Sequence, residues 1–107
     1  MDIIYQLNNM ELNIGAIFIS NRILQDKYPP KWMYREEPRE EGGSGWRVFS
    51  GDEEEEFLDN HDNFKLVTAD QLIAIDDSLK TNLLAPYGFS FEKDNNKWKI
   101  VDAPEQL

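Results

Sequence analysis

The chain has 107 residues, of which 40% are hydrophobic and none is cysteine, and its formal net charge is −10. This length fits a single domain, residues 1–107, and the lack of cysteine excludes disulfides, thiolate nucleophiles and thiolate metal sites. The negative charge repels nucleic acid and anionic membranes but attracts basic proteins, so we expect neither nucleic acid nor a membrane as a partner.

Residues 1–13 are expected to form an N-terminal arm or a loose helix, without the basic region that opens a secretory signal. The longest apolar run, Ile14 to Ile19, is far shorter than the roughly 20 residues that a membrane-spanning helix needs. The β-branched residues of this run instead predict a short buried strand. Because the chain has no cysteine, a reducing cytoplasm is the compartment that we expect.

Two further strands are expected at residues 31–36 and 46–50, on either side of a connector that is rich in glycine and mixed in charge. Side chains alternate across a strand, so Trp46 points to one face of the sheet while Arg47 and Phe49 point to the other.

The clearest helix begins after Thr68, whose hydroxyl can cap the free amide groups of the first turn. Gln71, three residues later, can return a hydrogen bond to the cap residue and complete a capping box. Leu72, Ile75 and Leu79 then share one face at helical spacing, which predicts a helix packed on the core.

A β-hairpin is expected at the C-terminal end, with strands at residues 89–93 and 97–101. The turn between them contains two asparagines, which tolerate left-handed backbone angles. Together these elements predict an α+β fold, with an antiparallel or mixed sheet of about five strands and two or three short helices in a single domain.

Residues 51–63, which we call the acidic segment, hold seven carboxylates and no Lys or Arg. The segment has four open interpretations: an active site, a metal site, a surface for a basic partner, and a solvated helix start. Ser50 and Glu53 have the spacing of a capping box, which predicts a helix with residues 52–56 in its first turn and a half. Acids in that position interact favourably with the helix dipole, by roughly 0.3–1 kcal/mol each.

Catalytic and metal-binding interpretations of the acidic segment have little support in the residue pattern. An acid–base pair needs one carboxyl in an apolar pocket, whereas four consecutive glutamates point around a helix into water. The segment lacks the central glycine and the distal glutamate of a calcium loop. His61 is the only histidine of the chain and has no partner at a persuasive spacing. We therefore predict no catalytic, cofactor-binding or metal-binding residue, and no enzyme activity.

Several short motifs give the chain a resemblance to a known family. They are Ser20-Asn21-Arg22-Ile23-Leu24, Tyr34-Arg35-Glu36, and Ser44-Gly45-Trp46-Arg47 followed by Phe49, Ser50, Gly51 and Glu53. Over about residues 15–101 the chain is similar to a family of small bacterial immunity proteins of polymorphic toxin systems, the thirty-third Imm family, first catalogued as a domain of unknown function. Members often carry an acid just before the Ser-Gly-Trp step, where this chain has Gly43.

The resemblance implies a protein that binds a cognate toxin stoichiometrically and performs no chemistry. An acidic helix beside an aromatic strand suits this role, because charge steers a basic toxin and aromatic residues supply affinity. The alternative is a small non-catalytic regulatory or scaffold module with another partner. The sequence makes no prediction of the oligomeric state. The predicted toxin-contacting residues are Trp46, Arg47, Asp52, Glu53, Glu55, Glu56 and Asp59.

Overall fold

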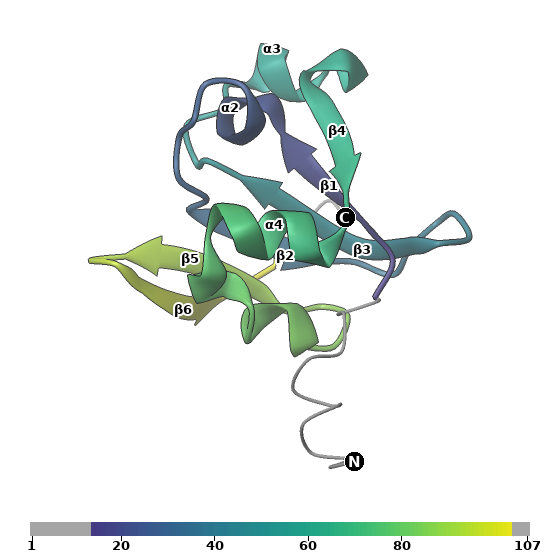
Figure 1. Cartoon of the computed structure of the whole chain (residues 1–107), viewed down its shortest axis with the longest axis vertical. Coiled ribbons are helices and arrows are strands. Elements are labelled where there is room, and N and C mark those ends of the chain that lie inside the picture. The colour runs from purple at the N-terminus through teal and green to yellow at the C-terminus, as the bar shows by residue number, and fades with distance from the viewer. Residues whose placement is uncertain (1–13, 104–107) are drawn as a thin grey trace.

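A mixed sheet of six strands, in the order β4-β1-β3-β2-β5-β6, organises the computed structural model, which describes residues 14–103 (Figure 1). β1 and β3 are parallel, and all other neighbours are antiparallel. The predicted α+β fold with a mixed sheet is confirmed, whereas the arm or helix expected at residues 1–13 lies outside the described residues. The strands are β1 (Ala16–Ser20), β2 (Trp32–Arg35), β3 (Gly43–Phe49), β4 (Phe64–Val67), β5 (Ser90–Asp94) and β6 (Lys97–Val101).

Short helices connect the strands and lie on one face and at one end of the sheet (Figure 1). The α-helices are α2 (Asn21–Leu24), α3 (Glu55–Leu58) and α4 (Ala69–Ile75). The 3-10 helices are η1 (His61–Asn63), η2 (Asp77–Leu79) and η3 (Asn82–Leu84). None of the helices between residues 14 and 103 is both long enough and apolar enough to span a membrane.

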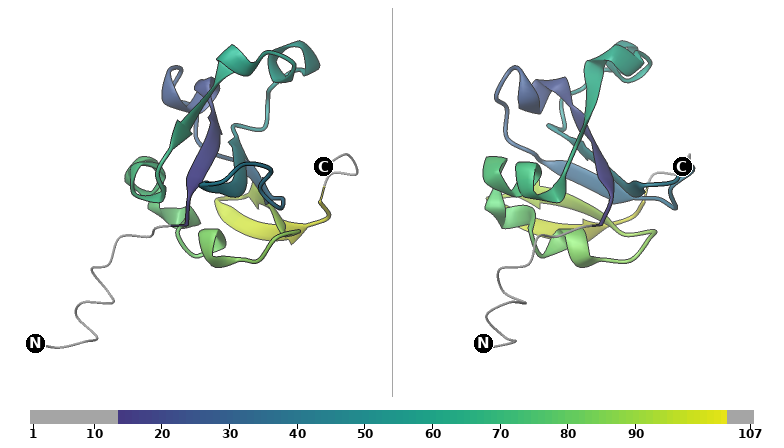
Figure 2. Two further views of the ribbon diagram at one scale, coloured as in Figure 1. Left: turned by 90° about the vertical axis from the view of Figure 1, so that its right-hand side faces the viewer. Right: turned by 45° about the vertical axis from the view of Figure 1, so that its right-hand side comes forward.

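The hydrophobic core lies between the sheet and the segment that runs from α4 to η3, on the face of the sheet that we call the inner face (Figure 2). Ile17, Met33 and Val48 reach the core from β1, β2 and β3, and Leu72 and Leu79 reach it from α4 and η2. These five side chains are fully buried. The core therefore ties the centre of the sheet to the helical segment.

The capping box predicted at the start of α4 is present, with hydrogen bonds in both directions between Thr68 and Gln71. The apolar stripe predicted along this helix is only partly correct. α4 ends at Ile75, which is 44% exposed, whereas Leu79 reaches the core from η2 after a change of chain direction at Asp76.

β4 is the strand that the sequence did not predict. It pairs with β1, placing Val67 opposite Ile17 and Phe64 opposite Ser20. Its four residues are too few to establish an alternating pattern, and only Lys65 among them is polar. Pairing with a strand far away in the sequence determines this element, so local periodicity could not find it.

Gly45 is required by the backbone at the start of β3. Its φ angle is 85°, in the left-handed region that favours glycine. A Cβ atom at this position would overlap the carbonyl oxygen of Glu36. The same close approach lets the Glu36 amide donate to the Gly45 carbonyl at 3.0 Å. The fold therefore explains why the Ser44-Gly45-Trp46 motif has glycine at position 45.

Candidate functional site

The acidic segment folds as a turn followed by a short helix, not as one capped helix. Glu53 accepts hydrogen bonds from the Ser50 amide (2.8 Å), the Ser50 hydroxyl (2.9 Å) and the Gly51 amide (2.9 Å). α3 starts only at Glu55, and its N-cap residue, Glu54, makes no side-chain cap bond. The prediction of a helix from residue 52 is wrong, because Gly51 takes a φ angle of 92° and the Ser50–Glu53 pair closes a turn instead.

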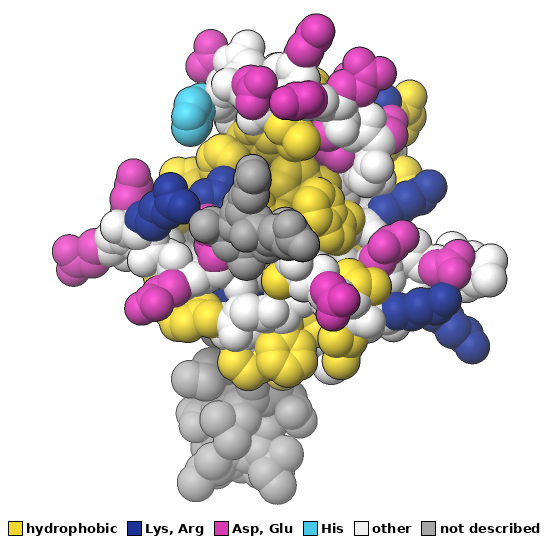
Figure 3. Space-filling view, turned by 180° about the vertical axis from the view of Figure 1, so that it is seen from behind, with side chains coloured by type: hydrophobic (Ala, Val, Ile, Leu, Met, Phe, Trp, Pro, Cys, Tyr) yellow, Lys and Arg dark blue, Asp and Glu magenta, His cyan; other side chains and the backbone are white. Residues whose placement is uncertain are grey.

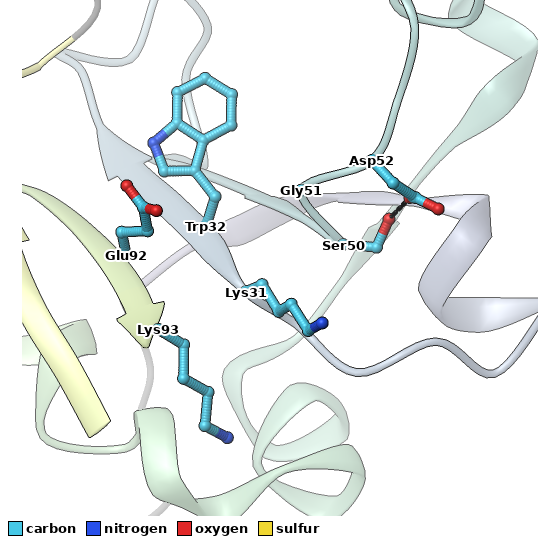
Figure 4. Close-up of a pocket in the computed structure, with 7 residues that line it drawn as sticks. All are labelled: Lys31, Trp32, Ser50, Gly51, Asp52, Glu92 and Lys93. Atoms are coloured by element: carbon cyan, nitrogen blue, oxygen red, sulfur yellow. Dashed lines mark hydrogen bonds between the residues drawn. The ribbon is translucent and has the colours of Figure 1, made fainter. Parts of the chain in front are cut away.

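α2 holds the acidic segment at both of its ends. At the start of the segment, the Arg22 guanidinium forms an ion pair with Asp52, which also accepts a hydrogen bond from Ser50 (Figure 4). At its end, the Asn21 amide nitrogen donates to the Asp62 carbonyl at 3.0 Å. The Ser20 hydroxyl caps α2 itself by accepting from the Arg22 amide. These contacts position α3, which lies between the two fixed points.

Arg22 and Ser50 determine the charge state of Asp52. The hydrogen bond from Arg22 and the one from Ser50 lower the pKa of Asp52 to about 2. The same pair raises the pKa of Arg22 above its usual range. Asp52 is therefore a fixed negative charge engaged within the protein, although half of its side chain remains exposed.

The predicted contact acids fall into two groups. Asp52 and Glu53 are engaged by neighbouring side chains or amides, so their first role is to shape the segment. Glu55, Glu56 and Asp59 are exposed, and no ion pair joins them to any residue between 14 and 103. Acidic side chains gather at the end of the molecule where α3 lies (Figure 3). Of the predicted contact acids, these three are the ones available to a cation from outside.

Trp46 and Arg47, both predicted contact residues, lie on opposite faces of the sheet, as strand alternation predicts. Trp46 is 1% exposed, and its indole nitrogen donates to the Leu83 carbonyl at 3.2 Å. The strand points the ring into the core, so in this fold the indole is not exposed to a partner. Arg47 points to the opposite face of the sheet, which we call the outer face. There its guanidinium pairs with Glu36 at 2.8 Å and lies 5.0 Å from the Phe18 ring centroid.

Aromatic rings form a continuous layer on the outer face, and this layer is the part of the site that sequence reasoning missed. Phe64 stacks on Phe18 with 4.7 Å between centroids, and Phe49 stacks on Trp32 at 4.8 Å. Contacts of 5.2–6.0 Å link the remaining rings to these pairs. Alternation of side chains along the strands could have grouped these rings on one face, but it does not show which face of the sheet the helices cover. The layer, named the aromatic face, consists of Phe18, Trp32, Tyr34, Phe49, Phe57 and Phe64.

A hollow of about 350 Å³ lies where the ends of β2, β3 and β5 meet (Figure 4). Lys31 extends across it toward Ser50 and Asp52, while the Lys93 ammonium pairs with Asp76 at 3.2 Å. Burial acts to raise the pKa of Asp76, but hydrogen bonds from Ser78 and Lys93 outweigh it and lower that pKa. The hollow presents charged groups of both signs, of which Asp52 and Lys93 already have ion-pair partners. Within residues 14–103, no three acidic or histidine side chains are grouped to hold a metal ion.

The motifs behind the family resemblance contact one another in space. Arg35 donates to the Ser44 carbonyl at 2.9 Å, and the Ser44 hydroxyl donates to the Ala16 carbonyl at 2.7 Å. The motif around Arg22 reaches the motif around Ser50 through Asp52. The motifs therefore form one framework that joins β1, β2 and β3 to α2 and the acidic segment.

No curated protein and no solved structure matches the chain. A family model described as "Immunity protein Imm33 domain" matches residues 17–102, which covers most of the sequence. The matched range includes the connected motifs, the acidic segment and all of the strands from β2 onward. The chain therefore belongs to the Imm33 family of immunity proteins.

Proposed function

We propose that this protein binds and neutralises a cognate toxin without catalysis, and that the exposed carboxylates of the acidic segment attract a basic surface of that toxin. Family membership supports the class of function. The observation that carries the proposal is that Glu55, Glu56 and Asp59 are exposed and lack an ion-pair partner among residues 14–103. Such carboxylates can pair with cationic groups of a partner, and no ion pair inside the protein has to break first.

The physical effect of these carboxylates is mainly on the association rate. Complementary charge raises association from about 10⁵–10⁶ M⁻¹s⁻¹ toward about 10⁸–10⁹ M⁻¹s⁻¹ at low salt, and added salt removes the gain. Exposed charges at a rim contribute less to the lifetime of the complex than to its rate of formation. The proposal therefore predicts fast binding that slows as ionic strength rises.

The proposed contact surface comprises Glu55, Glu56 and Asp59, supported by Asp52 and Glu53, with Arg47 on the adjoining outer face. We infer a single domain over residues 1–107 that acts in the cytoplasm, in keeping with a chain without cysteine. Neither nucleic acid nor a membrane is a proposed partner, since the net charge is −10.

The test uses a cognate toxin domain, sought first among the genes neighbouring this one, and an inactive variant of it is purified for binding. The wild-type protein is expected to form a stoichiometric complex with it and to protect cells when the active toxin is co-expressed. The triple variant Glu55→Lys, Glu56→Lys, Asp59→Lys is expected to associate at least 10-fold more slowly at low salt and to lose most of the salt dependence. The measurement is the association rate constant across ionic strengths.

A matched control separates local charge from net charge. Glu37, Glu40 and Glu41 are exposed and lie before β3, at the end of that strand opposite the acidic segment. Reversing these three acids changes the net charge by the same amount, and the association rate is expected to fall by less than about threefold. The proposal would be refuted if the two triple variants lowered the association rate constant equally, or if the wild-type protein formed no complex with the toxin domain.

The second candidate, a regulatory or scaffold module, is a non-catalytic binding protein as well. It differs from the first in its partner rather than in its residues. The same experiment separates the two, because a module of this kind would leave the neighbouring toxin unbound and the cells unprotected.

A further inference from the structure

The outer face of the sheet carries the aromatic face, and no helix between residues 14 and 103 packs across it. The core contacts of α4, η2 and η3 are on the inner face, while α2 and α3 lie at one end of the sheet (Figures 1 and 2). A sheet with one solvated face usually places polar residues there. Figure 3 looks onto this side of the molecule and shows hydrophobic side chains gathered in its middle. The aromatic face is therefore an apolar surface outside the core.

The rings of the aromatic face are packed among themselves but are not all buried. Phe49 is 5% exposed and Phe64 is 7% exposed, so these two form the floor. Trp32, Tyr34 and Phe18 are half-buried beside them. Leu66 of β4, which pairs with Phe18 in register, extends the same face and is 67% exposed. Half-buried aromatic residues around a packed floor are typical of the anchors of protein interfaces.

The acidic helix and the aromatic face are physically continuous. Phe57 belongs to α3, next to Glu56, and its ring contacts Phe64 edge to face with 5.7 Å between centroids. Figure 3 shows the acidic side chains directly beside the hydrophobic patch. A partner that contacts the α3 carboxylates would therefore reach the aromatic rings at the same time.

Part of the remaining charge on the outer face is paired within the sheet. Arg47 pairs with Glu36 at 2.8 Å, and Lys99 of β6 pairs with Asp94 of β5 at 2.8 Å. Glu55 and Glu56 of α3, beside the rings, have no ion-pair partner among residues 14–103. The surface complementary to this arrangement is apolar at its centre and cationic on one side.

We infer that the aromatic face is the apolar half of the toxin-binding interface. It takes a toxin surface with aliphatic or aromatic side chains at its centre and Lys or Arg side chains over α3. The inference rests on the proposed function and goes beyond it, because the anchor residues become Trp32, Tyr34 and Leu66 in place of the buried Trp46. A second copy of this chain is a poorer occupant, since two chains with a net charge of −10 each repel one another.

Two matched variants test the inference with the same inactive cognate toxin domain. Leu66 is 67% exposed on the outer face of β4, and Ile100 is 68% exposed on β6, where it pairs with the inner-face residue Phe91. Leu66→Gln and Ile100→Gln therefore remove equal apolar surface at edge strands without a charge change. Leu66→Gln is expected to raise the dissociation rate about 10-fold, and Ile100→Gln by less than twofold.

Trp32→Ala is expected to raise the dissociation rate by more than 10-fold while the association rate stays within about threefold of wild type. Circular dichroism establishes whether this variant folds, and Leu66→Gln carries the test if it does not. Two results would overturn the inference while leaving the proposed function intact. In the first, the wild type binds the toxin domain and Leu66→Gln dissociates from it at the wild-type rate. In the second, Ile100→Gln raises the dissociation rate as much as Leu66→Gln does. A wild-type dimer that Leu66→Gln dissociates would also overturn it. Failure of the wild type to bind would instead refute the proposed function.

Discussion

Trp46 is the largest fully buried side chain, and its role is to fill the core. Trp46→Phe removes the indole donor, so the Leu83 carbonyl loses the hydrogen bond measured at 3.2 Å. We expect a loss of about 1–3 kcal/mol in the free energy of unfolding, measured by urea denaturation. Toxin affinity should stay unchanged, because the ring does not reach the surface. A variant with normal stability and weakened toxin binding would show that Trp46 is a contact residue after all.

The Arg22–Asp52 pair makes a prediction about pH. The pKa of Asp52 is lowered to about 2, so the pair contributes its stability above the ordinary aspartate pKa and loses it as pH falls from about 4 toward 2. The carboxyl carbon of Asp52, followed by NMR, should titrate near pH 2 in the wild type. In Arg22→Met the midpoint should move back toward the ordinary value.

Asp26→Asn is the control for that titration, because Asp26 also pairs with Arg22, at 3.1 Å, yet does not contribute to the lowered pKa of Asp52. This variant should leave the Asp52 midpoint within a few tenths of a unit of the wild type. An Asp52 midpoint near 4 in the wild-type protein would contradict the ion pair as described.

At the scale of elements, α2 is expected to hold the acidic segment in place. Asn21 is 8% exposed, and its side-chain amide nitrogen donates to the Asp62 carbonyl, while its side-chain oxygen Oδ1 has no hydrogen-bond partner among residues 14–103. Asn21→Ala should therefore cost little global stability, about 1 kcal/mol or less. It should nevertheless speed amide hydrogen exchange across residues 55–63, because one of the two fixed points is lost.

Asn82→Ala is the matched control for the α2 prediction. Asn82 is also 8% exposed, but its amide contacts the Met33 sulfur at 3.7 Å in the core. Its substitution should leave exchange across residues 55–63 unchanged. Equal acceleration in both variants would mean that the segment responds to general destabilisation and not to α2.

The comparison of the two predicted capping boxes shows what sequence reasoning can reach at this scale. The box at Thr68 is present as predicted, because α4 follows Thr68 directly and packs on the core through Leu72. The pair Ser50 and Glu53 is bonded too, but Gly51 and the contact with Arg22 turn it into a separate turn. The sequence predicts the local hydrogen-bonded pair in both places. It does not predict the contact between Arg22 and Asp52, which makes the second pair part of a turn.

At the scale of the whole molecule, the sequence predicted the fold class and most strands but not which face of the sheet remains open. Strand alternation separates Trp46 from Arg47 and Phe49 correctly, since the structure puts them on opposite faces. Both faces are apolar, however, so composition alone could not tell core from surface. Which face becomes the core depends on where the segment from α4 to η3 packs, and long-range contacts determine that packing.

Peptide-resolved hydrogen exchange of the complex tests the central claim, that the toxin binds at the acidic segment, most directly. It compares the free protein with the protein bound to the inactive cognate toxin domain. We predict slower exchange in residues 52–62, with no change in residues 69–84 on the inner face. Protection confined to residues 69–84, with residues 52–62 exchanging as in the free protein, would contradict the account.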